Sequence, residues 1–483
     1  MSSEFEGGTT RPLRILHVGN IANNAYLSAK AQRVHGLDAV VVSPRPPFIM
    51  GFPEWEELSF HVHDQNHLDG VIGGSEFQSP DWFVSGSWDH IRTKVGARWG
   101  HDLPPHAASL RSPRYFTERG LDIAWPWIRQ MLTSVIPPKW KPRLASTLLY
   151  SARRRLANTR AITETLAFAD IVHLYGPYAD VAEFAPPGKP IVALEHGTLR
   201  DFVWASLPAS RASAHGYLVA DRVMLTNQDC LAPSIRLGIS PERIIKGPHS
   251  SFAEPLLRAR RARQQWLAQA GSPDRTILIP ARHTQPSAVD VGKGTDEILT
   301  CISFIADRFA DVTFQLVDWG DFSIRSKHVL RKAGLDTRVQ WLPLLSRQLL
   351  QSYMANALCF IDQLTIPAYG GITSDCLGIG VPVITAHDCG IDSAYFGSCA
   401  PVLPSGSSAA TLKESERVLL PSFDQNRYFF EATTWYDHFL GSDIALNASL
   451  TAYAGLTKPD RLPNKRPVPP LPSDVLTFAR HLP

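Results

Sequence analysis

Short apolar runs alternate with helix-like segments along most of the chain. Near the start, the apolar runs at 13–18 and 38–43 flank a helix-like stretch from Ala25 to His35. This spacing predicts two parallel strands joined by a crossover helix. Three further runs of the same kind follow in the first half of the chain, at 170–176, 190–197 and 220–226. Each run ends in a polar or glycine-containing turn, and ligands of open α/β sheets bind at such strand ends.

A second series of strand-like runs occupies the other half of the chain, with helical patterns between them. These runs lie at 276–280, 312–317, 338–342, 357–361 and 382–385. Because strands and helices alternate twice over, the sequence predicts two doubly wound, Rossmann-like α/β domains that face each other across a cleft. We place the two domains at 13–255 and 270–450, and we expect the arginine-rich segment 254–272 to be the linker between them.

Both ends of the chain lack this alternating pattern. Residues 1–12 are polar and predict a disordered lead-in. The tail at 451–483 is rich in proline, and we expect it either to extend over the surface or to return to the first domain.

Residues 45–160 form an insertion in the first domain. The part up to residue 140 is rich in proline, glycine and serine, and it holds seven of the twelve tryptophans: Trp55, Trp82, Trp88, Trp99, Trp125, Trp127 and Trp140. Aromatic faces stack on sugar rings or lipid tails, so this part is a candidate acceptor pocket; the alternative is a structural layer of buried tryptophans. The basic stretch at 138–160 predicts a helix that either contacts an anionic membrane or forms a solvated face.

Composition and charge narrow the class of protein. The 483 residues are 44% hydrophobic and 19% charged, which is typical of a globular protein with two domains. The 48 basic and 45 acidic residues leave a net charge of +3, and this balance argues against a dedicated nucleic-acid binder. No apolar run approaches the roughly 18–20 residues that span a bilayer, and the polar start lacks the apolar core of a secretory signal. The sequence therefore predicts a cytoplasmic protein, with peripheral contact at the inner membrane face through 138–160 as an option.

The six cysteines show neither a CxxC pair nor the spacing of a metal site. They are Cys230, Cys301, Cys359, Cys376, Cys389 and Cys399. Several stand in apolar surroundings, where a free thiol behaves as a small hydrophobic side chain. We therefore expect all six to be reduced and structural, and the sequence predicts no metal site.

Two cationic side chains follow the first strand-like run of the second half. Arg282 stands at the end of that run, and Lys293 lies between two glycines before the next helix. Two cations that point into one cleft can neutralise a diphosphate. The alternative is that both are solvated side chains beside a loop.

A second candidate is the segment Gly370-Gly371-Ile372-Thr373, with Asp375 after it. Two glycines at the start of a helix leave backbone N–H groups open, and the helix dipole favours an anion there. The Asp375 carboxylate is placed to accept hydrogen bonds from ribose hydroxyls. In the alternative interpretation the glycines only form a turn, and Asp375 only complements the helix dipole.

A third candidate is formed by two strand-end turns that contain Gly320 and Leu342. Backbone groups of these turns are candidates for holding a nucleobase. Trp319 and Trp341 stand beside them and would either stack on the base or pack in the core, which is the commoner use of tryptophan.

The order of these motifs resembles the large retaining GT-B glycosyltransferase family with an E-x7-E motif, the group 1 or family 4-like enzymes. The resemblance is most specific at 276–294 and 367–385. In the first half, Gly19-Asn20 resembles the family's glycine loop after the first strand, and His196 resembles its strand-end histidine, which touches the transferred sugar. Pro367 stands where the family has its first glutamate, and Asp375 stands at the second.

This resemblance implies a GT-B enzyme that moves a sugar from a nucleoside diphosphate sugar to an acceptor hydroxyl. It implies transfer with retention and without a metal or other cofactor. The implied donor is a UDP-sugar more often than a GDP-sugar, and the implied acceptor is a glycan, a lipid-linked molecule or a small molecule. Catalytic roles are implied for His196, Arg282 and Lys293. Donor contacts are implied for Gly19, Asn20, Gly320, Leu342, Gly370, Gly371, Ile372, Thr373 and Asp375.

Other functions remain open at the level of sequence. Inverting transfer needs a general base near the acceptor hydroxyl, for which His196 and Asp201 are candidates. A sugar-nucleotide epimerase has the same two-domain architecture. The proline at 367 also fits a degenerate transferase that only binds or acts as a scaffold.

Overall fold

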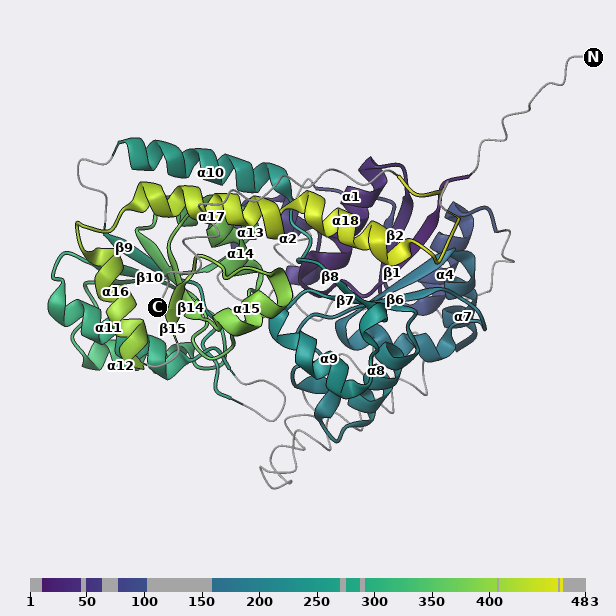
Figure 1. Cartoon of the computed structure of the whole chain (residues 1–483), viewed down its shortest axis with the longest axis horizontal. Helices are drawn as coiled ribbons and strands as arrows, with labels where there is room; N and C mark the ends of the chain where they lie inside the picture. Colours follow the sequence, from purple (N-terminus) through teal and green to yellow (C-terminus); the bar gives the residue numbers. More distant parts are fainter. Residues whose placement is uncertain are drawn as a thin grey trace, which may run out of the picture.

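The computed structural model describes residues 11–44, 49–62, 77–101, 159–269, 275–286, 292–405, 408–458 and 461–463. Trp125, Trp127 and Trp140 lie outside these residues, as do all but the end of the expected lead-in at 1–12, all but the end of the basic stretch at 138–160, and most of the proline-rich tail. The described residues form two α/β domains side by side (Figure 1).

The first domain is built on a parallel sheet of seven strands in the order β4-β2-β1-β5-β6-β7-β8. The strands are β1 Arg14–Val18, β2 Asp38–Ser43, β4 Phe83–Ser85, β5 Ile171–Tyr175, β6 Ile191–Leu194, β7 Arg222–Leu225 and β8 Ile244–Lys246. The helices are α1 Asn24–Val34, α4 Trp88–Arg98, α7 Thr159–Phe168, α8 Pro208–Val219 and α9 Leu231–Leu237. The side chains of successive strand residues point to opposite faces of the sheet: Ile15 packs in the core on one side and Leu16 in the core on the other.

The second domain has a parallel sheet of six strands in the order β11-β10-β9-β13-β14-β15. These strands are β9 Thr276–Ile279, β10 Thr313–Val317, β11 Val339–Leu342, β13 Cys359–Ile361, β14 Val383–Ala386 and β15 Leu403–Ser405. Its helices are α11 Thr295–Arg308, α12 Ser323–Lys332, α13 Arg347–Asn356, α14 Gly371–Ile379, α15 Cys389–Phe396, α16 Ser408–Leu419 and α17 Gln425–Phe439. Two doubly wound domains with parallel sheets confirm the fold class that the alternating pattern predicts.

Most of the segment 254–272, which we expected to link the two domains, forms the long helix α10 Ala253–Ala268. Its buried residues Leu256, Ala259 and Arg263 recur at helical spacing and pack on α13 and α14. The intervening arginines obscure this apolar stripe in the sequence. α10 therefore belongs to the second domain (Figure 1).

The chain returns to the first domain through α18 Ser442–Tyr453. Figure 1 shows α17 and α18 running one after the other along the same side of both domains. α18 contacts α1, β7 and β8, and Tyr453 is fully buried there. The boundary that we expected at residue 450 lies inside this helix.

An arm of the first domain reaches the second domain on the other side of the cleft. It contains α2 Glu54–Glu57 and β3 His61–Val62, and β3 pairs antiparallel with β12 Leu344–Leu345. The backbone N–H of Ser346 also donates to the carbonyl of Phe60 at 2.9 Å. The arm therefore fixes α2 against the start of α13.

The prediction that all six cysteines are reduced is wrong for one pair. Cys389 and Cys399 form a disulfide with their Cα atoms 5.1 Å apart, a usual separation for such a bond. They bracket the short helix α15, which folds the chain back so that two residues ten positions apart meet. The other four cysteines are free and buried: Cys230, Cys301, Cys359 and Cys376.

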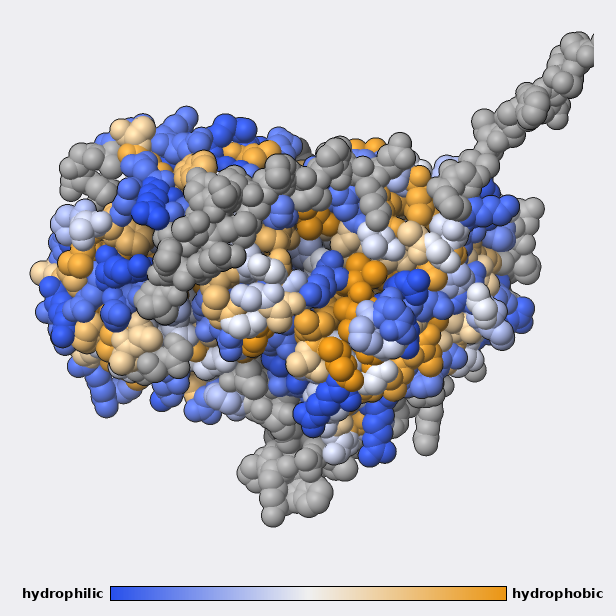
Figure 2. All heavy atoms as spheres, viewed as in Figure 1, coloured by the Kyte–Doolittle hydropathy of each residue, from blue (hydrophilic) through white to orange (hydrophobic). Residues whose placement is uncertain are grey.

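Along the described part of the chain, no helix combines the length and apolarity needed to cross a bilayer. Figure 2 shows hydrophobic side chains gathered on the first domain between α18 and α9. Exposed apolar residues of the first domain include Leu218 and Val219, at the C-terminal end of α8, and Ile235 on α9.

Candidate functional site

A cavity of about 170 Å³ lies between the two domains. The first domain lines it with residues that follow β1, β6 and β8 and with residues of the α2 arm; the second lines it with residues of β10, β12, α13 and α14. Four of the predicted site residues are among the lining: His196, Gly371, Ile372 and Asp375. Since the carboxyl ends of parallel strands from both sheets reach this cavity, it occupies the place where α/β folds bind ligands.

His196 follows β6 and meets two polar side chains of its own domain. Its Nδ1 lies 3.4 Å from Nδ2 of Asn24, and Oδ1 of Asn24 lies 3.1 Å from Nδ1 of His249. The two imidazole rings cross edge to face at 4.8 Å. Burial, together with the nearby cations Arg200 and Lys293, lowers the pKa of His196 to about 4. At neutral pH this imidazole is therefore uncharged.

Lys293 approaches the same region from the second domain. It lies close enough to His196 for its charge to act on the imidazole. Its ammonium group donates to Oε1 of Gln363, which follows β13. The structure therefore brings two of the three predicted catalytic side chains, His196 and Lys293, together across the cleft.

The start of α14 faces the cavity. Gly370 is the N-cap, and Gly371 and Ile372 are the first two helical residues and line the cavity. Backbone N–H groups in the first turn of a helix lack an intrahelical partner and favour an anion. Thr373 instead points into the protein, where its buried hydroxyl donates to Oδ2 of Asp362 at 2.6 Å.

Asp375 is already paired. Its carboxylate accepts from Nη2 and Nε of Arg347, at 2.8 and 2.9 Å, and from Nε2 of Gln351 at 3.0 Å. Three of about four lone-pair positions are occupied by protein donors. We expected Asp375 within the first turn of its helix, but as the fifth residue of α14 it lies just beyond that turn. Its main contact is with α13.

Glu56 is a lining residue that sequence reasoning missed. Its side chain is 4% exposed, and Oε2 lies 3.6 Å from Nη1 of Arg347. Burial raises the pKa of Glu56 to about 7; Arg347 opposes this shift and Asp375 adds to it. One guanidinium therefore faces two buried carboxyl groups. No local signal marks Glu56, because its partners belong to helices about 290 residues later.

The remaining predicted residues do not line the cavity. Asn20 is fully buried and organises its own loop, donating to Asn23 and to the carbonyl of Gly51 and accepting from the N–H of Tyr26. Gly19 has φ +86° and lies against the ring of Tyr178.

In the second domain, Gly320 has φ +97° and lets the backbone pass close to His283. Arg282 lies with its guanidinium 5.9 Å from the ring of Trp319, which itself lines the cavity. Leu342 is buried in the core, and its carbonyl accepts from the N–H of Asp318.

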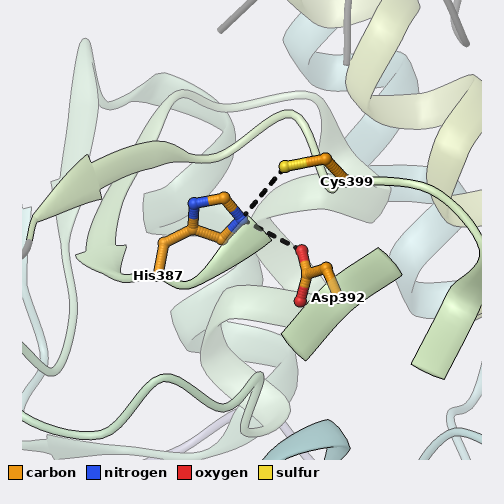
Figure 3. Close-up of side chains that lie close together, drawn as sticks. All are labelled: His387, Asp392 and Cys399. Atoms are coloured by element: carbon orange, nitrogen blue, oxygen red, sulfur yellow. Dashed lines mark hydrogen bonds and ion pairs between the residues drawn. The ribbon is translucent and has the colours of Figure 1, made fainter. Parts of the chain in front are cut away.

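Within the described residues, one group of three side chains has the spacing of a metal site: His387, Asp392 and Cys399 (Figure 3). Nε2 of His387 lies 3.0 Å from Oδ2 of Asp392 and 3.4 Å from Sγ of Cys399. Oδ2 of Asp392 also accepts from the hydroxyl of Tyr369 and from the N–H of Ala400. Hydrogen bonds and the disulfide of Cys399 account for this arrangement.

Comparison with known proteins gives matches among solved structures. No family model matches the chain, and no curated protein matches it by sequence. The structure of Anabaena HepE in complex with UDP matches with a TM-score of 0.56 at 12% identity, covering 92% of this chain and 100% of HepE. Its complex with UDP and glucose matches with a TM-score of 0.55, also at 12% identity and with the same coverage.

A glycosyltransferase from Rickettsia africae matches with a TM-score of 0.54 at 11% identity, over 93% of this chain and all of that one. The chain has the GT-B fold. At such low identity the likeness establishes this fold alone. The cavity described above lies between the two domains of the GT-B chain.

Proposed function

We propose that this GT-B chain is a glycosyltransferase that transfers a sugar from a UDP-sugar to an acceptor hydroxyl. The observation that carries the proposal is the meeting of two domains at one cavity. There the start of α14 and His196 line the same cavity from opposite domains, and the charge of Lys293 acts on the uncharged imidazole of His196. These groups match the parts of a nucleoside diphosphate sugar: an anion and a neutral, hydroxyl-rich ring.

Lys293 and the N–H groups of Gly371 and Ile372 are the groups that we assign to the diphosphate. As the sugar departs, negative charge grows on the leaving diphosphate, and a fixed cation and fixed N–H dipoles stabilise that charge. We also expect Arg282, which does not line the cavity in this structure, to contribute positive charge near the diphosphate. We infer front-face transfer with retention and without a metal, since this mechanism asks the protein chiefly for positioning and electrostatics.

His196 suits the sugar because it is neutral. With a pKa of about 4, it accepts and donates hydrogen bonds near pH 7 without placing a charge beside the reacting centre. Asn24 and His249 hold its ring in place. The same low pKa makes His196 a weak base, which counts against it as the base of an inverting reaction.

The choice of UDP rests on the structural neighbours. HepE was solved with UDP and with UDP-glucose. Because that likeness extends over the whole chain, we transfer the nucleotide to this protein as a proposal and prefer UDP to GDP. The acceptor stays a glycan, a lipid-linked molecule or a small molecule.

A thermal-shift titration tests the donor site. Purified protein is titrated with UDP, GDP, ADP, dTDP and CMP. We expect selective stabilisation by UDP, since a ligand at about 100 times its Kd adds roughly 2.7 kcal/mol. Lys293→Met should weaken the effect of UDP, and Lys332→Met, at an exposed position on α12, should leave it intact.

The same titration can contradict the proposal. If no nucleotide stabilises the protein, the donor site is absent and a degenerate scaffold is the better description. If UDP binds, incubation with UDP-sugars and analysis of products separates two activities: conversion of the donor without any acceptor would indicate an epimerase. Release of UDP that depends on an added acceptor would indicate transfer.

A further inference from the structure

α15 carries contacts of the second domain with the first domain beside the cleft. Tyr395 is buried within the hydrophobic core of the first domain. Its hydroxyl donates to the carbonyl of Leu225 and accepts from the N–H of Gly247 at 3.0 Å. Nζ of Lys246 donates to the carbonyl of Ala394 at 2.8 Å. The position of α15 therefore helps to set how the two domains meet.

The other side of α15 leads to the candidate anion site. Oδ1 of Asp392 accepts from Nε2 of Gln228, in the first domain, at 3.2 Å. Oδ2 of Asp392 accepts from the hydroxyl of Tyr369, whose own N–H donates to Gln228. Tyr369 directly precedes the glycines that begin α14. One short helix thus links the first domain to the start of α14.

The disulfide closes the chain around this helix. Cys389 is the first residue of α15 and is exposed, whereas Cys399 follows the helix and is 3% exposed. His387 places Nε2 at 3.4 Å from Sγ of Cys399 (Figure 3). The two sulfur atoms therefore differ: one is open to attack, and the other has a hydrogen-bonding imidazole beside it.

We propose that Cys389 and Cys399 are a site of reversible thiol–disulfide exchange with a protein dithiol, and that their redox state sets how firmly α15 joins the two domains. A thiolate of the dithiol attacks Sγ of Cys389, the Cys389–Cys399 bond breaks, and Cys399 leaves as a thiolate that takes a proton. The second thiolate of the dithiol then attacks the dithiol sulfur that is bonded to Cys389. Cys389 leaves as a thiolate that takes a proton. The protein disulfide is reduced to two thiols, and the dithiol is oxidised to a disulfide.

The remaining cysteines do not compete for this exchange. Cys230, Cys301, Cys359 and Cys376 are buried, and burial raises the pKa of each thiol. Thiolate is the reactive form, so these four are inert while the protein is folded. An exposed sulfur and a buried leaving sulfur next to His387 make the α15 pair the reactive one.

The test counts thiols in the folded protein. Wild-type protein, oxidised and without denaturant, is incubated with or without reduced thioredoxin, alkylated and analysed by mass. We expect no alkylation before reduction and two labels afterwards, on Cys389 and Cys399. Cys301→Ser is the matched control at a buried cysteine and should gain the same two labels. The number of labels on Cys389→Ser should not depend on the reductant.

Two further readouts connect the exchange to the cleft. Reduction should lower Tm in the wild type and in Cys301→Ser and leave Tm unchanged in Cys389→Ser. If the proposed function also holds, reduction should weaken UDP binding by about fivefold, the lower end of usual coupling between sites.

The proposal fails if Cys389 and Cys399 are alkylated without reductant, if the disulfide resists thioredoxin until the protein is unfolded, or if reduction leaves Tm unchanged. Exchange with a Tm shift but no UDP binding would sustain this site and contradict the proposed function instead.

Discussion

Replacing Glu56 by glutamine should change how stability depends on pH. Burial raises the pKa of Glu56 from about 4.5 to about 7, so between these values the folded protein holds a proton that the unfolded chain has lost. The free energy of unfolding must then fall as pH rises through this window. Each unit of pKa corresponds to about 1.36 kcal/mol, which gives a total of about 3 kcal/mol. A glutamine at 56 does not titrate, so this contribution disappears.

Urea unfolding at pH 5, 6, 7 and 8 measures the effect. The difference in unfolding free energy between Glu56→Gln and wild type should grow in favour of the variant by about 2 to 3 kcal/mol from pH 5 to pH 8. Glu242→Gln is the control: the pKa of Glu242 is lowered by hydrogen bonds to Ser240 and to its own backbone, so its titration lies below this range. Parallel profiles for wild type and Glu56→Gln would show that folding does not raise the pKa of Glu56, and would refute the reasoning that burial outweighs the attraction of Arg347.

Two further substitutions test the geometry around the cleft. Gly19→Ala should destabilise the protein more than Gly36→Ala, by about 1–3 kcal/mol in urea unfolding: both glycines have φ +86°, but an added Cβ at 19 would meet the ring of Tyr178 at 2.3 Å and one at 36 would meet nothing. Equal losses would mean that only backbone strain matters. Arg347→Met should cost about 3–5 kcal/mol because it leaves the Asp375 carboxylate buried without its cation, and adding Asp375→Asn should restore much of the loss. If the double variant is no more stable than Arg347→Met, the loss arises from packing.

Most of the fold could be predicted from the sequence because both sheets are parallel and buried on both faces. Such strands are short, continuous apolar runs, and β2 spans the predicted 38–43. The runs at 312–317 and 338–342 differ from β10 and β11 by one residue each. Three of the four edge strands escaped prediction: β4, β8 and β15 have three residues each, too few to show a period.

The candidate site was less predictable, since its contacts join segments that are far apart in the chain. Local spacing located His196, Lys293 and the start of α14, because each follows a strand end. It said nothing of Arg347, whose side chain crosses from α13 to Asp375 on α14. The ribose role expected for Asp375 depended on that carboxylate lacking a protein partner.

The return of α18 to the first domain has a consequence for synthesis on the ribosome. The core on one face of the first sheet includes Leu446, Leu450 and Tyr453 as well as residues of β1 and β2. A domain made first by the ribosome usually folds first. Here α1 covers part of that face early, but the part that packs against α18 waits while roughly 200 further residues are added, about 10–40 s at usual rates of elongation. For that interval the nascent first domain lacks the apolar side chains that α18 contributes to its core.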